Sequence, residues 1–156
     1  MAGRLEREIK QNRPFSIQEE VVLSMLRTAD QLAASMNEVL RPAGLSFSQY
    51  NVLRILRGAG GEGLPCGEIS ERMVSRDPDL TRLLDRLESR GLVTRSRSTS
   101  DRRVVRAVIT PEGLGLLDSL DAGVDAAVNS SLAHMPKPRL DALVELLEEA
   151  RAGQPA

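Results

Sequence analysis

One helix that leads directly into a β-hairpin is the feature of this sequence that most restricts its fold. The helix is expected to start at Asp77 and Pro78, because an aspartate can cap free backbone N–H groups and a proline has no N–H to lose in the first turn. Gly91 is placed to end it. Its buried side is a stripe of leucines, Leu80, Leu83, Leu84 and Leu87. The sequence therefore predicts an amphipathic helix over about 77–90.

A β-hairpin is expected immediately after this helix. Residues 92–97 and 104–109 flank a polar tip at 98–101, and the second of these segments is rich in β-branched side chains. Two arginines, Arg102 and Arg103, follow the tip directly. The predicted hairpin therefore carries two cations at its projecting end.

The other apolar residues recur at helical spacing. Ser16 with Glu19, and Ser46 with Gln49, have the spacing of capping boxes, in which each side chain satisfies a backbone N–H of the other residue. Helices are expected over about 17–40, from 46 to the glycines at 58–63, over 66–73, from 111 to 132 and around 140–147. The first of these helices has a wider apolar stripe than one small domain is expected to cover.

Composition excludes several classes of protein. The lone cysteine and the lone histidine, Cys66 and His134, cannot form an internal disulfide or a structural zinc site. We interpret Cys66 as a packing residue, with oxidant sensing as the alternative, and His134 as a surface residue of a turn. Aromatic residues make up only 2% of the chain, which argues against a protein that stacks single-stranded bases.

The sequence also lacks the features of a membrane protein and of an enzyme. Its apolar runs fall short of the roughly 18 to 20 residues that a membrane span needs, and its charged start does not resemble a secretory signal. We therefore expect a cytoplasmic protein with no membrane partner. Without a nucleophile triad, a phosphate-binding glycine loop or a metal cluster, neither catalysis nor a cofactor is expected.

Positive charge is concentrated in the middle of the chain. The net charge is −1, yet residues 76–110 carry nine arginines and five carboxylates, whereas residues 111–156 carry three basic and eight acidic side chains. Arg82, Arg86 and Arg90 are spaced four apart, so they share a helix face away from the leucines. A helix fits the major groove of B-DNA, and an arginine-bearing loop can enter the adjacent minor groove. The middle of the chain is therefore predicted to bind duplex DNA.

Two stretches resemble the MarR family of winged helix-turn-helix transcriptional regulators. DLTRLLDRLESRGLV, at 79–93, is similar to the recognition helix of that family and its exit into the wing. DRRVVRAVITPEG, at 101–113, is similar to its wing signature, with Ile109 where the family has leucine. The resemblance covers about Ser46 to Gly113. It implies a mainly α fold with a small β-hairpin wing, in which a winged helix-turn-helix is flanked by N- and C-terminal dimerisation helices.

The resemblance also implies an organisation and a function. It implies a single domain over 1–156, with a DNA-binding lobe at 46–110 and helical dimerisation regions at 16–45 and 111–151. A homodimer on a palindromic operator in double-stranded DNA is implied, acting as a transcriptional regulator, expected to be a repressor, that a small-molecule effector modulates. Because aromatics are scarce, leucine, valine and methionine are expected to line the effector pocket. The alternative is a winged-helix protein-interaction module without sequence-specific DNA binding.

The resemblance assigns roles to individual residues. Arg103 matches the wing arginine that enters the minor groove, and Asp101 matches the carboxylate that holds the wing loop in shape. Thr81 and Arg82 match positions of the recognition helix that face DNA. The predicted DNA-binding residues are Arg76, Asp79, Thr81, Arg82, Arg86, Arg95, Arg97, Arg102 and Arg103, with Asp101 as wing support.

Alternatives stay open for four charged residues of the predicted recognition helix. Asp77 and Asp79 are interpreted as groups that satisfy backbone N–H donors at the helix start. The alternative for Asp79 is to accept a hydrogen bond from a cytosine amino group. Arg86 and Arg90 are interpreted as solvated residues paired with neighbouring carboxylates such as Asp85 and Glu88, with base reading, or contact with phosphates only, as the alternative.

Overall fold

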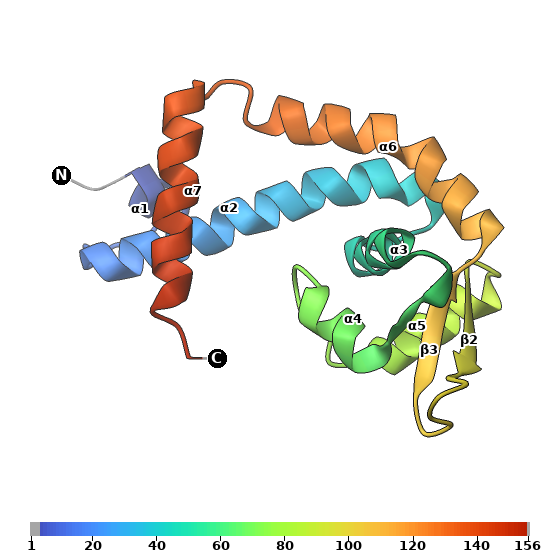
Figure 1. The fold of residues 1–156 in the computed structure, drawn as a ribbon. Helices are drawn as coiled ribbons and strands as arrows, with labels where there is room; N and C mark the ends of the chain where they lie inside the picture. The colour runs from blue at the N-terminus through green and yellow to red at the C-terminus, as the bar shows by residue number, and fades with distance from the viewer. Residues whose placement is uncertain (1–3, 156) are drawn as a thin grey trace.

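Two groups of elements make up the structure, a lobe of short elements and an arm of long helices (Figure 1). The computed structural model describes residues 4–155. The lobe contains α3 (Phe47–Ala59), η2 (Gly60–Glu62), β1 (Leu64–Pro65), α4 (Cys66–Arg72), α5 (Leu80–Ser89), β2 (Val93–Arg97) and β3 (Val105–Ile109). The arm contains α1 (Arg4–Glu8), α2 (Ile17–Leu40), α6 (Pro111–Ser131) and α7 (Lys137–Ala152), and η1 (Arg41–Ala43) joins α2 to the lobe. The predicted mainly helical fold with a small β wing is confirmed.

Hydroxyl side chains cap the starts of three helices. The Ser16 hydroxyl accepts a hydrogen bond from the Glu19 N–H at 3.1 Å, and the Glu19 carboxylate accepts one from the Ser16 N–H at 2.9 Å. Ser46 and Gln49 make the same pair of bonds at 3.2 and 3.0 Å. Thr110 caps α6 through its side chain. All three caps confirm helix starts that the sequence predicts, because a cap is made between residues that are close in the chain.

The start of α5 differs from the prediction. The helix begins at Leu80, and its N-cap is Asp79 rather than Asp77. The Asp77 carboxylate instead accepts a hydrogen bond from the Asp79 N–H at 2.9 Å. An aspartate that bonds the backbone two residues later stabilises a turn that competes with the helix. This turn holds Pro78 outside α5, so the helix is shorter than predicted at this end.

The end of α5 matches the prediction. Gly91 has a φ of 71°, a left-handed conformation that glycine adopts without a steric penalty. The Leu92 N–H donates to the Leu87 carbonyl at 3.0 Å, and the Gly91 N–H donates to the Glu88 carbonyl at 2.9 Å. These two bonds form a Schellman motif, which turns the chain directly from α5 into β2.

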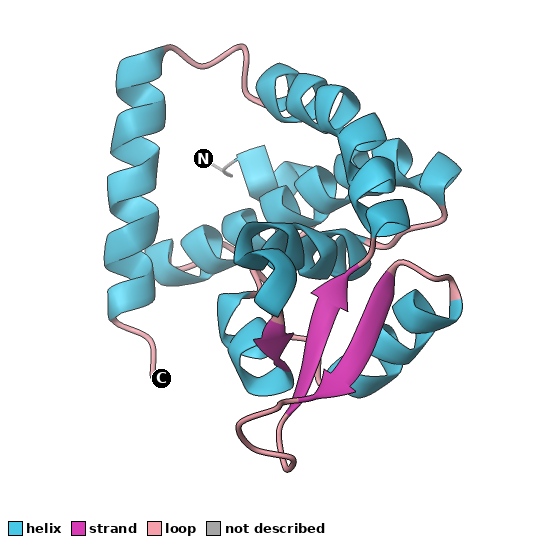
Figure 2. Ribbon diagram, turned by 45° about the vertical axis from the view of Figure 1, so that its right-hand side comes forward, coloured by secondary structure: helices cyan, strands magenta, loops and turns pink. Residues whose placement is uncertain are grey.

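A third strand joins the predicted hairpin. The antiparallel sheet has the order β1-β3-β2, and Figure 2 shows the short β1 beside the two longer strands. In β1, Leu64 pairs with Ala107 and Pro65 with Arg106. A two-residue strand that includes a proline has no alternating pattern, which is why the sequence did not predict it. Strand β1 ties the wing to the body of the lobe.

The hydrophobic core lies inside the lobe and continues into the base of the arm. The largest fully buried side chains are Leu40, Leu53, Leu56, Ile69, Leu84, Leu87, Leu117, Val52 and Val93. They come from the three α-helices of the lobe, from β2, from the end of α2 and from the first half of α6. The leucine stripe of α5 is therefore buried as predicted, which leaves the opposite face of that helix outside.

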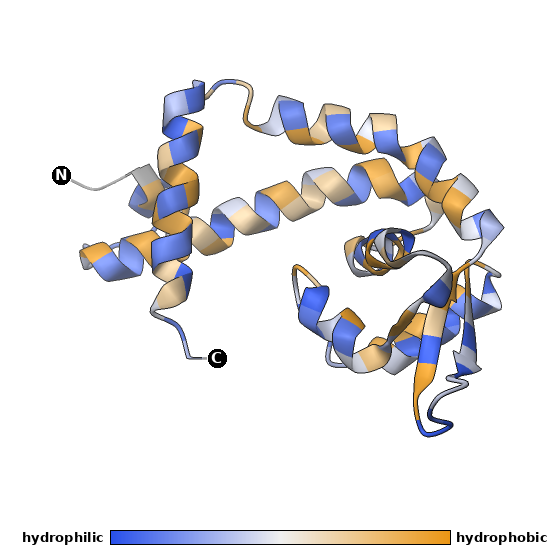
Figure 3. Cartoon of the chain, viewed as in Figure 1, coloured by the Kyte–Doolittle hydropathy of each residue, from blue (hydrophilic) through white to orange (hydrophobic). Residues whose placement is uncertain are grey.

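The arm exposes apolar side chains along its helices. Figure 3 shows hydrophobic segments on α2 and α7, and α7 crosses near the start of α2. The large exposed hydrophobic residues of the arm include Ile17, Val21, Val22, Met25, Leu26, Val128, Val144 and Leu146. The width of the stripe on α2 is thus as predicted. Among the helices of residues 4–155, none has the length and apolarity needed to span a bilayer.

Candidate nucleic-acid interface

The outer face of α5 carries three of the predicted contact residues. Thr81, Arg82 and Arg86 are all exposed, because the leucines on the opposite face occupy the core. The Asp79 carboxylate accepts a hydrogen bond from the Arg82 N–H at 3.4 Å, and its second oxygen lies 3.2 Å from Arg82 Nε. Asp79 therefore caps the helix, as interpreted from the sequence. The Arg82 side chain is still 71% exposed, so its guanidinium extends into solvent.

A hollow of about 190 Å³ lies between the starts of α3 and α5. It is lined by Ser46, Gln49, Asp77, Asp79, Arg82, Leu83 and Arg86. The N-terminal end of α3 carries the positive end of a helix dipole, and two arginines of α5 share the hollow with it. Ser46 and Gln49 are not among the predicted DNA-binding residues. Their capping box located a helix start, but only the tertiary structure brings that start beside α5.

The wing tip presents two arginines from a loop with a defined backbone. The Asp101 carboxylate accepts a hydrogen bond from the Arg103 N–H at 3.0 Å, and the Asp101 carbonyl accepts one from the Val104 N–H at 3.0 Å. Arg97 donates to the Arg102 carbonyl at 2.8 Å. These bonds engage the backbone of Arg102 and Arg103, and the side chains of both remain exposed.

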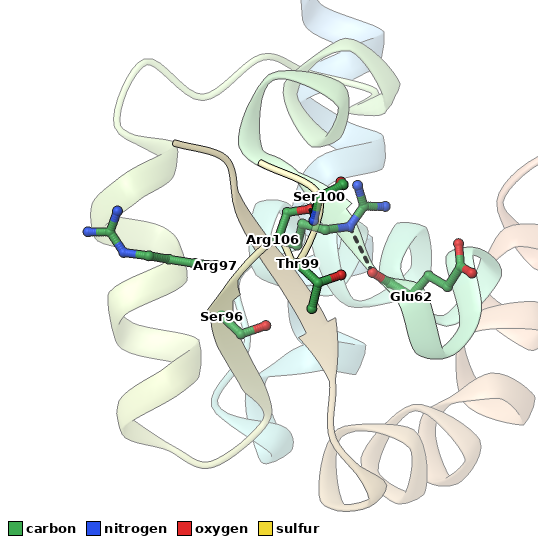
Figure 4. Close-up of a pocket in the computed structure, with 7 residues that line it drawn as sticks. Glu62, Ser96, Arg97, Thr99, Ser100 and Arg106 are labelled. Atoms are coloured by element: carbon green, nitrogen blue, oxygen red, sulfur yellow. Dashed lines mark hydrogen bonds between the residues drawn. The ribbon is translucent and has the colours of Figure 1, made fainter. Parts of the chain in front are cut away.

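One side of the wing is hollowed over about 390 Å³ (Figure 4). This hollow is lined by Ser96, Arg97, Ser98, Thr99, Ser100 and Arg106, together with Glu62 of η2. The side chain of Arg97 points away from those of the other labelled residues (Figure 4). Arg106 does not act as a free cation there. It donates to the carbonyls of Glu62 and Gly63, both at 2.9 Å, and so fastens β3 to the segment before β1.

Arg90 has partners that the sequence did not predict. It was expected in solvent or beside neighbouring carboxylates. Instead, its guanidinium donates to the backbone carbonyls of Ala43 and Gly44, at 2.8 and 2.9 Å. These carbonyls precede α3, more than 40 residues away in the chain. Arg90 therefore fastens the end of α5 to the entrance of α3.

Arg95 is also held within the lobe. Its guanidinium donates to the carboxylates of Asp85 and Glu88 on α5, with a distance of 3.1 Å to Glu88. The hydrogen bond from Arg95 is the main cause that holds the pKa of Glu88 below its ordinary value, and the two carboxylates together raise the pKa of Arg95. The Arg95 side chain is only 21% exposed.

The other predicted arginines have side chains without a partner in the structure. In the part of the chain from 4 to 155, no hydrogen bond or ion pair engages the guanidinium groups of Arg76, Arg86, Arg102 and Arg103. All four side chains are exposed, and they lie on the turn before α5, on α5 and at the wing tip. Together with Arg82 they form the cationic surface of the lobe.

Cys66 and His134 lie outside this surface. Cys66 is a half-buried free thiol at the start of α4, and His134 is exposed in the turn between α6 and α7. Across the described residues, no three His, Cys, Asp or Glu side chains are grouped as they would be around a metal ion.

Comparisons with known proteins agree on one family. The model of the MarR family matches residues 45–105. The HTH-type transcriptional regulator TtmR of Methylorubrum extorquens (strain PA1) is 32% identical over 145 residues, which are 90% of this chain and 73% of TtmR. The crystal structure of a MarR transcription factor from Planctomyces limnophilus is 39% identical, with a TM-score of 0.67 over 87% of this chain and 98% of that one.

A further solved structure is Sco3205, a MarR family transcriptional regulator from Streptomyces coelicolor in complex with DNA. It is 25% identical, with a TM-score of 0.78 over 94% of each chain. These proteins are transcriptional regulators and not enzymes, which agrees with the expectation from the sequence. The resemblance seen at residues 79–93 and 101–113 is thereby confirmed, and this chain belongs to the MarR family of transcriptional regulators.

Proposed function

We propose that this regulator binds a palindromic site in double-stranded DNA as a homodimer, and that it represses transcription there. The observation that carries the proposal is the set of exposed arginines on two neighbouring elements, Arg82 and Arg86 on α5 and Arg102 and Arg103 at the wing tip. An α-helix has the diameter that the major groove accepts, and a narrow loop suits the minor groove. One lobe would therefore contact two adjacent grooves.

The contacts within the lobe make such an approach to DNA favourable. Asp77 and Asp79, which would otherwise repel phosphates, accept hydrogen bonds from the backbone at the start of α5. Thr81 and Arg86 face outward on the same helix, and Arg76 lies on the turn before it. At the wing, Asp101 supports the loop while Arg103 enters the minor groove, where negative potential favours arginine. Arg97, on the outer side of β2, is assigned to the adjacent phosphates.

A second copy of this chain would cover the apolar faces of the arm. A groove of about 500 Å³ between α2 and α7 is lined by Ile17, Gln18, Val21, Val22, Met25, Leu26, Ala150, Arg151 and Gln154. A patch of this kind on an isolated chain is typical of a subunit interface, and a two-fold dimer buries the same patch twice. Two lobes related by this axis would contact half-sites about 34 Å apart, one turn of DNA.

A small-molecule effector is assigned to the junction of α2 and α6. An apolar hollow of about 200 Å³ lies there, lined by Leu32, Ser35, Met36, Ala127, Val128, Ser131 and Leu132. Its leucine, valine and methionine side chains agree with the lining expected from the scarcity of aromatics. A ligand between these helices would change the separation of the two lobes, so ligand and DNA would weaken each other's binding by the same factor.

The experiment that tests the proposal is a binding titration on the palindrome-containing DNA upstream of the protein's own gene. Wild type and Arg103→Ala are compared over a range of salt concentrations. Arg139→Ala is the control, because it removes one positive charge from α7. The start of α7 lies at the opposite end of the molecule from the wing (Figure 1). Log affinity falls as log salt rises, and each lost phosphate contact makes this negative slope shallower by about 0.9.

We expect wild type and Arg139→Ala to bind this DNA equally well, and Arg103→Ala to bind it more weakly with a smaller salt slope. If wild type shows no preference for the fragment over random duplex, the fragment is not an operator. If it also fails to prefer any sequence selected from a random library, the proposal is wrong and the winged-helix interaction module takes its place.

A further inference from the structure

We propose that Arg95 is a positioning residue of the DNA-binding lobe, which orients α5 against the wing and does not contact DNA itself. The proposal rests on the proposed function, in which α5 and the wing enter adjacent grooves. It assigns Arg95 a role different from the one predicted from the sequence, where it belongs to the set of DNA-contacting arginines.

The contacts of Arg95 join two elements that must hold a fixed angle. Its Nη2 atom donates to Glu88 Oε1 at 3.1 Å and also to Asp85 Oδ1. Its backbone N–H donates to Glu88 Oε2 at 2.9 Å. The Glu88 carboxylate thus binds residue 95 both at its backbone and at its guanidinium, so β2 cannot rotate about α5 without breaking several charged hydrogen bonds.

The position of Arg95 in the sheet carries this restraint to the wing. Arg95 is the middle residue of β2 and pairs with Ala107 of β3, which is fully buried. The same two strands continue to the wing tip with Arg102 and Arg103. A contact between the middle of β2 and α5 therefore sets the direction in which the wing arginines leave the lobe, relative to the arginines of α5.

The accessibility of Arg95 separates it from the exposed arginines of the cationic surface. Its side chain is 21% exposed, whereas that of Arg82 on the outer face of α5 is 71% exposed. The guanidinium is already committed to two carboxylates, and a phosphate would have to displace them.

A double-mutant cycle distinguishes positioning from direct contact. We compare Arg95→Ala in the wild-type chain with Arg95→Ala in an Asp85→Asn, Glu88→Gln chain, and we measure affinity for the operator and for random duplex over a salt series. If Arg95 acts through the two carboxylates, its removal lowers operator affinity strongly in the chain that keeps them. The same removal has little effect in the chain that lacks them, because the effects of coupled residues are not additive. Arg103→Ala, made in both chains, is the matched control for a residue that touches DNA.

The expected result has three parts. Arg95→Ala weakens operator binding about tenfold in the wild-type chain and less than about twofold in the chain without the carboxylates. Its affinity for random duplex and its salt slope stay near those of wild type, so only the preference for the operator falls. Arg103→Ala, in contrast, lowers operator affinity by the same factor in both chains and makes the salt slope shallower by about 0.9.

Other outcomes overturn the proposal in distinct ways. If Arg95→Ala lowers operator affinity equally in both chains and makes the salt slope shallower, Arg95 contacts a phosphate directly. Arg95→Ala could instead lower the affinity for operator and random duplex equally, with an unchanged salt slope and a lower unfolding temperature. In that case Arg95 only stabilises the fold. If Arg95→Ala does not fold, Arg95→Lys replaces it, since a lysine can serve a phosphate as a point charge but lacks the planar fork that spans two carboxylates. If Arg95→Lys binds the operator as tightly as wild type, Arg95 is not a positioning residue.

Failure of the proposed function is recognised separately. It appears in the wild-type chain as the absence of any sequence preference, before a variant is compared. A wild-type operator preference together with additive effects of Arg95 and the carboxylates rejects the role of Arg95 alone.

Discussion

The guanidinium of Arg57 on α3 forms a two-pronged ion pair with the carboxylate of Asp121 on α6. The two hydrogen bonds are 2.9 and 3.0 Å long, and Asp118 adds a third at 3.3 Å. The hydrogen bond from Arg57 lowers the pKa of Asp121, and the carboxylates raise the pKa of Arg57. This cluster joins the lobe to the long helix of the arm, so it stabilises the angle between them.

Arg57→Ala is therefore expected to loosen the lobe from α6. The Arg57 side chain is 28% exposed, so solvent screens the pair and the thermal unfolding midpoint should fall by only a few degrees. Differential scanning calorimetry measures the change. Lys137→Ala, which removes an exposed ion pair to Asp141 within α7, serves as the control and should leave the midpoint nearly unchanged. An equal effect of the two variants would contradict a special role for Arg57.

Loss of Arg13 should raise the pKa of Glu19. The pKa of Glu19 is lowered from 4.5 to about 2, mainly by the hydrogen bond from Arg13 and next by the Ser16 N–H. A carboxylate with a lowered pKa stabilises the fold above its unfolded pKa, and that contribution disappears as the pH falls from about 4.5 toward 2. NMR titration of the Glu19 carboxyl should show its midpoint rising toward 4.5 in Arg13→Ala. A midpoint that does not move would show that the capping box alone lowers this pKa.

Gly63→Ala is expected to disrupt the attachment of the wing. Gly63 has a φ of 62°, and a Cβ atom there would lie 2.1 Å from the Ala107 carbonyl oxygen on β3. The backbone strain and the clash together should cost about 3 kcal/mol or more in the free energy of unfolding. Urea denaturation measures this cost. Gly61→Ala is the control, because nothing lies within 4 Å of its added Cβ, and a similar loss there would contradict the argument.

Leu26→Glu should convert the proposed homodimer to a monomer without unfolding the lobe. Leu26 is 62% exposed in the single chain and lines the apolar groove between α2 and α7, so a charge there is harmless in the monomer and unfavourable in a buried interface. Sedimentation velocity measures the mass, and circular dichroism checks the helices. Gln31→Glu is the control, because Gln31 lies on the same helix but lines a separate hollow whose lining is mostly polar, and this variant should remain dimeric. A dimeric Leu26→Glu variant would place the interface elsewhere.

The local features of this fold could be predicted from the sequence. The capping boxes at Ser16 and Ser46, the leucine stripe of α5, its glycine end and the hairpin all depend on residues that are close in the chain. The predicted start of α5 was wrong by two residues, because the Asp77 carboxylate stabilises a turn that precedes the helix and Asp79 caps the helix instead. The short helix α1 and the strand β1 had no pattern long enough to predict them.

The spacing of leucines and arginines is enough to predict that a helix with one leucine face and one arginine face leads into an arginine-tipped hairpin. Which of these arginines are available to a ligand depends on how the elements pack in the folded lobe. Arg90 and Arg106 donate to carbonyls more than 40 residues away, and Arg95 reaches back to α5, whereas Arg86, Arg102 and Arg103 stay free. The exposure of a long charged side chain depends on the acceptors that folding brings within its reach, and for these arginines the acceptors lie on other elements of the structure.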